Sequence, residues 1–189
     1  KLEAKNYNDS FQVNFINDYY DKIIFGVNNE FLYELKINGI DFKKSEIQKY
    51  YFPDTQNYFG FVDGNKFYNR NPYRELVIHD LKNKSITNLG ECPTIWEMVK
   101  TGDNEFYASG WEVNYPKGGL LKIKNGKITD ISSDLKLPTS KFWCLYYDLP
   151  TKQLFAGSVD QGIFIIDLSN KITLESNLFN HNKELNCLL

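Results

Sequence analysis

Short apolar runs separated by polar turns recur along the chain, and the clearest example lies between Ser140 and Asp167. That stretch holds apolar runs at residues 142–147, 154–156 and 163–166, and a further run follows at 171–174. Runs of this length that are rich in aromatic and β-branched side chains, with Gly or Pro in the turns between them, are typical of antiparallel strands. Because one small four-stranded sheet is not stable alone, the pattern predicts further copies packed against it.

The copies are indicated by an asparagine-containing turn after the third apolar run of each repeat. These turns are centred on Asn38, Asn83, Asn125 and Asn170, at spacings of 45, 42 and 45 residues. Similar second runs recur with them, at residues 24–26, 67–69, 106–108 and 155–157. A period of about 44 residues with four strands per period is typical of a β-propeller. The alternative is an ordinary β-sandwich with evenly spaced turns.

The repeats divide the chain into four predicted blades and the first strand of another. The blades span residues 11–42, 50–89, 94–131 and 140–175, and the further strand spans 185–189. Residues 43–49 are polar, so we predict a connecting loop there, with a single helical turn as the alternative. Propellers close with several blades and avoid bare sheet edges, so we expect an all-β segment of a larger ring. Alternatively, residues 185–189 join the first sheet and close a four-bladed ring.

Composition favours β structure and argues against a nucleic-acid partner. Aromatic residues make up 16% of the 189 residues, which favours strands. The formal net charge is −2 and no basic run is present, so the sequence lacks the electrostatic footprint of a nucleic-acid-binding protein. No apolar stretch approaches the ~20 residues of a membrane helix, and the sequence opens at Lys1 without a signal-peptide pattern.

No constellation of residues indicates catalysis, a metal or another cofactor. The sequence contains no serine-hydrolase, zinc-protease or phosphate-loop motif. His79 and His181 fall in different repeats, and we interpret them as structural or surface residues. Cys92, Cys144 and Cys187 form no C-x-x-C pair, and the last two stand one repeat apart. We interpret that pair as small buried apolar residues rather than as a disulfide or metal pair.

The candidate binding residues are chosen by blade topology. The loop that leads into the first strand of a blade and the loop between its second and third strands lie on one face, and such loops commonly carry ligand sites. The residues that map to this face are Arg70, Tyr73, Arg74, Trp96, Trp111, Tyr115 and Trp143. Arginine binds carboxylate or sulfate in a bidentate manner and tryptophan offers a flat face, so the set suits a saccharide or peptide ligand. The alternative is that Trp96 and Trp143 pack blade against blade and that the arginines are solvated.

Residues 142–148, 154–158 and 162–167 resemble the two-component-regulator propeller repeat. That repeat reads apolar-Trp-Ser-Ile-x-x-Asp, then Leu-Trp-Val-Gly-Thr, then Gly-Gly-Leu-x-x-Tyr-Asp. The resemblance is partial over residues 92–130, and Phe155 stands here for the usual Trp. The repeat fills the periplasmic sensor region of hybrid two-component sensor kinases in Bacteroidetes-type bacteria.

The resemblance implies a sensor located in the periplasm or cell envelope. It implies a small saccharide or peptide ligand, glycan-derived in our reading, and a signal passed to other domains of the same polypeptide. Kinase activity would lie in those separate domains, and the parent protein could form a homodimer. Two alternatives stay open: a cell-envelope scaffold for protein interaction or secretion assembly, and a propeller hydrolase or lyase. A sensor predicts a wet aromatic and arginine pocket, a scaffold a flat apolar patch, and an enzyme converging carboxylates or histidines.

Overall fold

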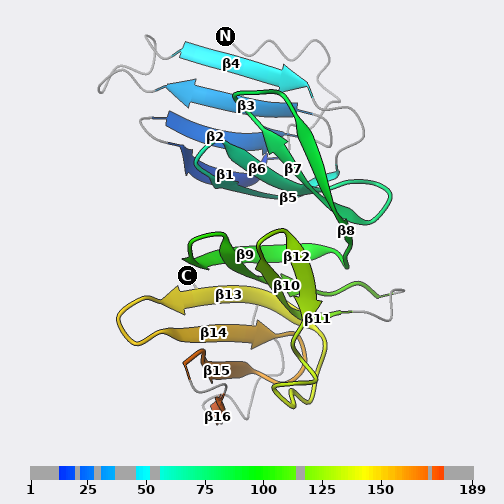
Figure 1. The fold of residues 1–189 in the computed structure, drawn as a ribbon, viewed down its shortest axis with the longest axis vertical. Helices are drawn as coiled ribbons and strands as arrows, with labels where there is room; N and C mark the ends of the chain where they lie inside the picture. The colour runs from blue at the N-terminus through cyan, green and yellow to red at the C-terminus, as the bar shows by residue number, and fades with distance from the viewer. Residues whose placement is uncertain are drawn as a thin grey trace. The chain divides into compact units, whose positions relative to one another are not determined.

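The computed structural model describes residues 13–19, 22–27, 31–36, 46–51, 56–113, 118–169 and 172–176. Every secondary-structure element in these ranges is a β-strand, and the strands form four antiparallel sheets of four strands each. Each sheet is a meander in which strands consecutive in sequence are neighbours (Figure 1). The predicted all-β class and the four-stranded blades are confirmed. No helix long and apolar enough to cross a membrane occurs in the described ranges.

The sixteen strands fall into four blades in chain order. Blade 1 comprises β1 (Val13–Tyr19), β2 (Lys22–Val27), β3 (Phe31–Lys36) and β4 (Glu46–Tyr51). Blade 2 comprises β5 (Gln56–Asp63), β6 (Lys66–Arg70), β7 (Glu75–Asp80) and β8 (Ile86–Glu91). Blade 3 comprises β9 (Ile95–Gly102), β10 (Glu105–Gly110), β11 (Gly119–Lys124) and β12 (Lys127–Asp130). Blade 4 comprises β13 (Phe142–Asp148), β14 (Gln153–Ser158), β15 (Ile163–Asp167) and β16 (Ile172–Ser176).

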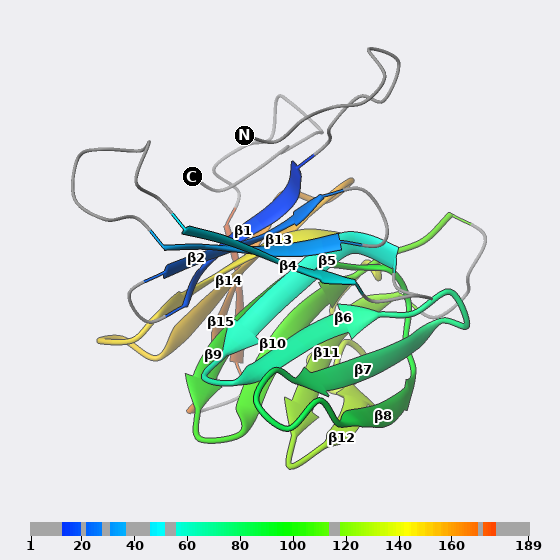
Figure 2. The same cartoon turned by 90° about the horizontal axis from the view of Figure 1, so that it is seen from above.

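The chain divides into two compact units, which we describe separately. The N-terminal unit consists of Lys1–Pro72 and Val77–Thr87 and holds blade 1 and most of blade 2. The C-terminal unit consists of Tyr73–Leu76 and Asn88–Leu189 and holds blades 3 and 4. The order of the strands from β9 to β12 in the C-terminal unit can be followed in Figure 2.

One predicted loop is a strand. Residues 43–49 were expected to connect two blades, but β4 begins at Glu46 and pairs with β3 along its length. An outermost strand has a neighbour on one side only, so it needs few apolar residues: Ile47 is 46% exposed, and the ammonium of Lys49 lies 5.8 Å from the centre of the Tyr33 ring. The predicted strands at residues 40–42 and 185–189 lie outside the described residues.

The core of the N-terminal unit forms where Phe15 of β1 packs against two glycines. Phe15 pairs with Gly26 of β2. A methyl group added at Gly26 or at Gly60 of β5 would lie 2.3 or 2.2 Å from the Phe15 ring. The ring stacks on buried Phe67, with 5.6 Å between centroids. These two glycines therefore serve the close packing of side chains rather than a turn.

His79 belongs to the same unit and is structural, as one of the two interpretations had it. It is buried in β7, and its ring centroid lies 5.7 Å from that of Phe67. Burial lowers the pKa of His79 to about 4, because the charged imidazolium is poorly solvated there. His181 lies outside the described residues. Within the described ranges, no group of three or more His, Cys, Asp or Glu residues is arranged to hold a metal ion.

The core of the C-terminal unit joins blade 3 to blade 4. Its buried members are Tyr107, Leu120, Leu135, Phe142, Leu145, Leu154, Ala156, Phe164 and Ile166. Cys144 is also buried, and its Sγ lies 2.6 Å from where a methyl group on Gly157 would stand. The burial of Cys144 agrees with its interpretation as a small buried apolar residue. Cys187 lies outside the described residues.

Candidate functional site

Two tryptophans are positioned by the same irregularity in neighbouring blades. The register of β9 against β10 skips Trp96, and that of β13 against β14 skips Trp143. The register of β1 against β2 skips Asn14 at the equivalent place. A β-bulge of this kind breaks the alternation of the strand and redirects the side chain of the extra residue. The repeated bulge therefore brings two indoles to corresponding positions of blades 3 and 4.

The three tryptophans of the chain gather in one cluster. The rings of Trp96 and Trp143 stack with centroids 4.2 Å apart and an interplanar angle of 14°. The ring of Trp111 lies 6.1 Å from that of Trp143, and the Trp96 indole N–H donates to the Trp111 carbonyl at 2.9 Å. All three side chains are half-buried. We call these residues the tryptophan cluster. The stack joins two blades, as the packing interpretation of Trp96 and Trp143 had it.

Next to this cluster, an ion pair and a hydroxyl hydrogen bond connect the loops of blade 3. The Thr94 hydroxyl donates to the Glu112 carboxylate at 3.2 Å, and the Arg74 guanidinium lies 3.2 Å from the other Glu112 oxygen. The backbone N–H of Trp111 donates to the Thr94 carbonyl at 3.0 Å. Arg74 adopts a left-handed backbone conformation with φ of 65°. We call Arg74, Thr94 and Glu112 the blade 3 latch, because they fasten the loop before β9 to the loop after β10.

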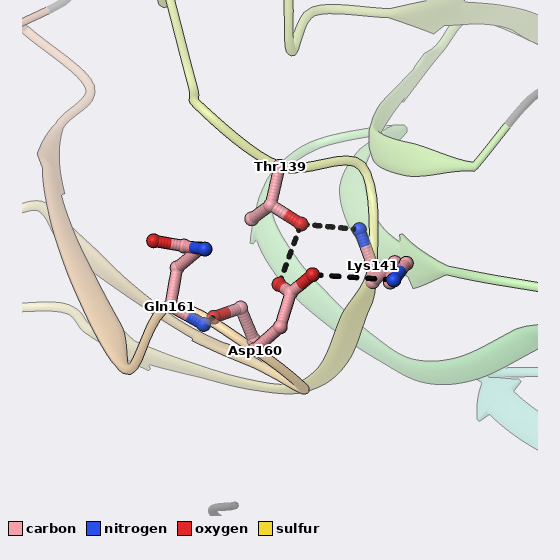
Figure 3. A network of polar contacts seen from close by, with 5 residues as sticks. Thr139, Lys141, Asp160 and Gln161 are labelled. Carbon is pink, nitrogen blue, oxygen red and sulfur yellow. Dashed lines mark hydrogen bonds and ion pairs between the residues drawn. The ribbon is translucent and has the colours of Figure 1, made fainter. Parts of the chain in front are cut away.

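Blade 4 has an equivalent latch, formed by Thr139, Lys141 and Asp160 (Figure 3). The Thr139 hydroxyl donates to one Asp160 oxygen at 2.8 Å, and the Lys141 ammonium lies 3.3 Å from the other. The backbone N–H of Gln161 donates to Ser158 Oγ at 2.8 Å, which holds the turn that carries Asp160. In both blades a threonine before the first strand binds an acidic residue after the second strand, and a cation pairs with that acid.

Blade 3 also carries a carboxyl group where blades 1 and 4 are apolar. The residue after the bulge is Phe15 in blade 1 and Cys144 in blade 4, whereas in blade 3 it is Glu97, which pairs with Ser109. Ser109 is fully buried, and its hydroxyl donates to the Trp143 carbonyl at 3.2 Å. Burial raises the pKa of the Glu97 carboxyl above its usual value. A partly desolvated carboxyl group therefore stands next to Trp96 in the sequence.

We expect Glu97→Gln to raise the melting temperature at neutral pH. The folded-state pKa of Glu97 is raised, so its protonated form stabilises the fold at low pH and that stability is lost as the pH rises through the folded-state pKa. Glutamine cannot ionise, and the gain should vanish in acid. Thermal denaturation at both pH values measures this. Glu105→Gln is the matched control with the opposite sign, because Lys122 and Lys124 lower the pKa of Glu105. Equal effects of the two substitutions at neutral pH would refute the assignment.

The remaining predicted residues are placed as follows. Arg70 ends β6 in the N-terminal unit and is 6% exposed, so the alternative that both arginines are solvated is wrong for Arg70. Tyr73 belongs to the C-terminal unit and is 74% exposed. Tyr115 lies outside the described residues. The structure thus brings Trp96, Trp111 and Trp143 together, next to the latch that contains Arg74.

The sequence interpretation missed the polar residues of this region. Thr94, Glu112, Lys141 and Asp160 form the latches, and Glu97 replaces an apolar repeat position. A signal for them was present, since each latch residue lies on one of the two kinds of loop that carried the predicted site. An alignment of the repeats would also single out Glu97 as a charged residue at an apolar position.

No protein-family model matches the sequence, and no curated protein is significantly similar to it. The fold is similar to that of the extracellular domain of a protein named as a hybrid two-component system, BT4673 of B. thetaiotaomicron, with a TM-score of 0.63, 17% identity and 92% of this chain covered. The extracellular domain of BT3049, named in the same way, gives a TM-score of 0.59, 14% identity and 90% coverage. The computationally designed Ika8 protein gives a TM-score of 0.64 at 11% identity, and the match covers 94% of this chain and 52% of Ika8.

These likenesses concern the fold. The chain spans about a quarter of each bacterial domain, 23% of the one and 25% of the other. A designed protein matches as well as the natural ones, so the similarity rests on the blade architecture. In fold, the chain is similar to extracellular domains of B. thetaiotaomicron hybrid two-component systems.

Proposed function

We propose that this chain is a ligand-binding part of an extracytoplasmic sensor in two-component signalling. Two observations support the proposal: the blade repeat in the sequence, and the likeness in fold to extracellular domains of hybrid two-component systems. In this role the chain binds a ligand in the periplasm or cell envelope and biases other domains of the same polypeptide. Any phosphotransfer takes place in those other domains.

The observation that carries the ligand site is the tryptophan cluster. Indole faces bind the apolar faces of sugar rings, and this cluster gathers three half-buried indoles at one place. The Arg74 and Lys141 cations of the latches can bind a carboxylate or sulfate, while the Glu112 and Asp160 carboxylates can accept hydrogen bonds from hydroxyl groups. We therefore propose an acidic, glycan-derived oligosaccharide as the ligand.

The test is calorimetric titration of the complete propeller with uronate-containing and neutral oligosaccharides. Because all three tryptophans of the chain belong to the cluster, intrinsic tryptophan fluorescence provides a second readout specific to this site. We expect an acidic oligosaccharide to bind and to change the emission. Trp111→Ala should lower its affinity by roughly tenfold or more, as truncation of a buried aromatic anchor does.

Two further variants sharpen this test. Arg74→Ala should weaken binding of the acidic oligosaccharide and leave binding of neutral oligosaccharides unchanged. Tyr146→Ala, an exposed aromatic residue of β13, is the matched control and should change neither affinity nor emission. Absence of saccharide binding, or binding that is indifferent to Trp111→Ala, would overturn the proposed site.

A protein-interaction scaffold is the second candidate, and two exposed apolar side chains favour it. Tyr73 is 74% exposed and Val113 is 79% exposed, and each is next in sequence to a member of the Arg74–Glu112 ion pair. Exposed apolar side chains on neighbouring loops are typical of a protein-binding surface. If this role holds, Tyr73→Ser and Val113→Ser abolish binding to a cell-envelope protein, and saccharides do not compete.

A further inference from the structure

A cleft of about 560 Å³ opens at the outer strands of blade 3 and the end of β15 in blade 4. Its floor is apolar: Leu135 and Ile166 belong to the buried core, and Ile131 and Leu168 pack against that core. The volume lies within the range of small-molecule sites. None of the residues that line the cleft belongs to the tryptophan cluster or to a latch, so it is separate from the proposed saccharide site.

Lysines line one wall of the cleft because β10, β11 and β12 align them in cross-strand rows. The first row runs from Glu105 through Lys124 to Lys127, and the second runs from Tyr107 through Lys122 to Thr129. Residues directly opposite each other on neighbouring strands have their side chains on the same face of the sheet. Lys122, Lys124 and Lys127 therefore share one face of blade 3.

The charges on this face do not balance. The Glu105 carboxylate pairs with Lys122 at 2.8 Å and with Lys124 at 2.6 Å. Lys127 stands directly opposite Lys124 and has no ion pair within the described residues. Like charges directly opposite each other on paired strands are destabilising. Asp134 supplies the one carboxylate among the lining residues, so three ammonium groups face two carboxylates on a chain whose net charge is −2.

We propose that this cleft binds a small anionic amphiphile. The carboxylate or sulfonate of the ligand lies between Lys124 and Lys127, where it relieves the repulsion between the two ammonium groups. The acyl or aryl body covers Ile131 and Leu168, and the removal of that apolar surface from water favours binding. The Thr129 hydroxyl lines the same wall and can donate to the anion.

The experiment is a titration of the full chain with sodium octanoate and with octanol, each below its aggregation limit, followed by calorimetry. We expect saturable binding of octanoate that weakens with salt, and weaker binding of octanol. Lys127→Gln should lower the octanoate affinity roughly fivefold, the upper end for an exposed ion pair, and leave octanol unchanged. Lys82→Gln, an exposed lysine of the β7–β8 turn, is the matched control and should have no effect.

Further variants and probes locate the site and distinguish a free small molecule from a phospholipid headgroup as the bound anion. Leu168→Gln should weaken binding of octanoate and of octanol alike. If that variant does not fold, Lys127→Gln still tests the proposal. Tryptophan emission should stay constant, because no tryptophan lines the cleft. Binding to anionic phospholipid vesicles without binding to free octanoate would contradict a small-molecule site. Absence of saturable octanoate binding, or binding that Lys127→Gln does not change, would overturn the proposal whatever the fate of the saccharide site.

Discussion

Acidification from pH 6.5 to pH 4 is expected to remove about 3 kcal/mol of stability from the N-terminal unit through His79 alone. Burial lowers the folded-state pKa of His79 to about 4 from 6.5. Between these values the unfolded chain binds a proton that the folded chain does not. The contribution of His79 is therefore fully present above pH 6.5 and is lost progressively as the pH falls towards 4.

Urea denaturation followed by far-ultraviolet circular dichroism measures this effect. His79→Phe keeps a ring that can contact Phe67 and cannot be protonated, so its stability should change less with pH than that of the natural protein. The comparison uses the difference between the two proteins at each pH, which cancels the titration of all the other groups. If the two proteins lose stability in parallel between pH 7 and pH 4.5, His79 does not carry the effect.

Phe142→Ala should lower the free energy of unfolding of the C-terminal unit by about 3–5 kcal/mol, the range for a buried aromatic residue replaced by alanine. Phe142 has no exposed surface, and its ring meets Phe164 edge to face with 5.8 Å between centroids. Because it belongs to the core shared by blades 3 and 4, the cavity left by alanine would disrupt the packing of both blades.

The measurement is chemical denaturation followed by tryptophan fluorescence, since the three tryptophans lie in this unit. Tyr146→Ala is the matched control: it removes an aromatic ring from the same strand at a position that is 55% exposed, and should cost about 0.5 kcal/mol or less. Phe142→Leu should fall between the two. A cost for Tyr146→Ala equal to that for Phe142→Ala would show that burial in this core is not what makes Phe142 important.

Much of the fold is predictable from the sequence, because each blade repeats the same inner strands. The second strands at residues 67–69, 106–108 and 155–157 combine aromatic and small residues that must be buried, so their spacing is visible. Strand β4 was missed because an outer strand is bound on one side only, and Glu46–Tyr51 carries the charged residues of an exposed segment. Burial decides which strands leave a recognisable pattern.

The candidate site is predictable only in part. Blade topology was enough to assign Trp96, Trp111 and Trp143 to one face, and the three rings are in contact. The bulges that bring Trp96 and Trp143 into a stack leave no mark in composition, because they depend on the register between strands. The partner of Glu112 was likewise not apparent, since Arg74 comes from a connection far away in the sequence.

The latches also separate two tasks that loops in many proteins must perform together: holding the blade in place and recognising a ligand. In each case the threonine and the acid fasten the blade before the chain reaches its third strand, and the residues after the acid number six in one blade, 113–118, and two in the other, 161–162. In blade 3 the intervening residues can differ in length because the latch is already complete at Glu112, whereas in blade 4 the backbone N–H of Gln161 still holds the turn through Ser158 Oγ. A recognition segment grafted directly after Glu112 should therefore leave the blades intact, whereas the hydrogen-bonded turn from Ser158 to Gly162 in blade 4 should be kept, so the blade 3 loop is the natural position for changing the specificity of the proposed site by loop exchange.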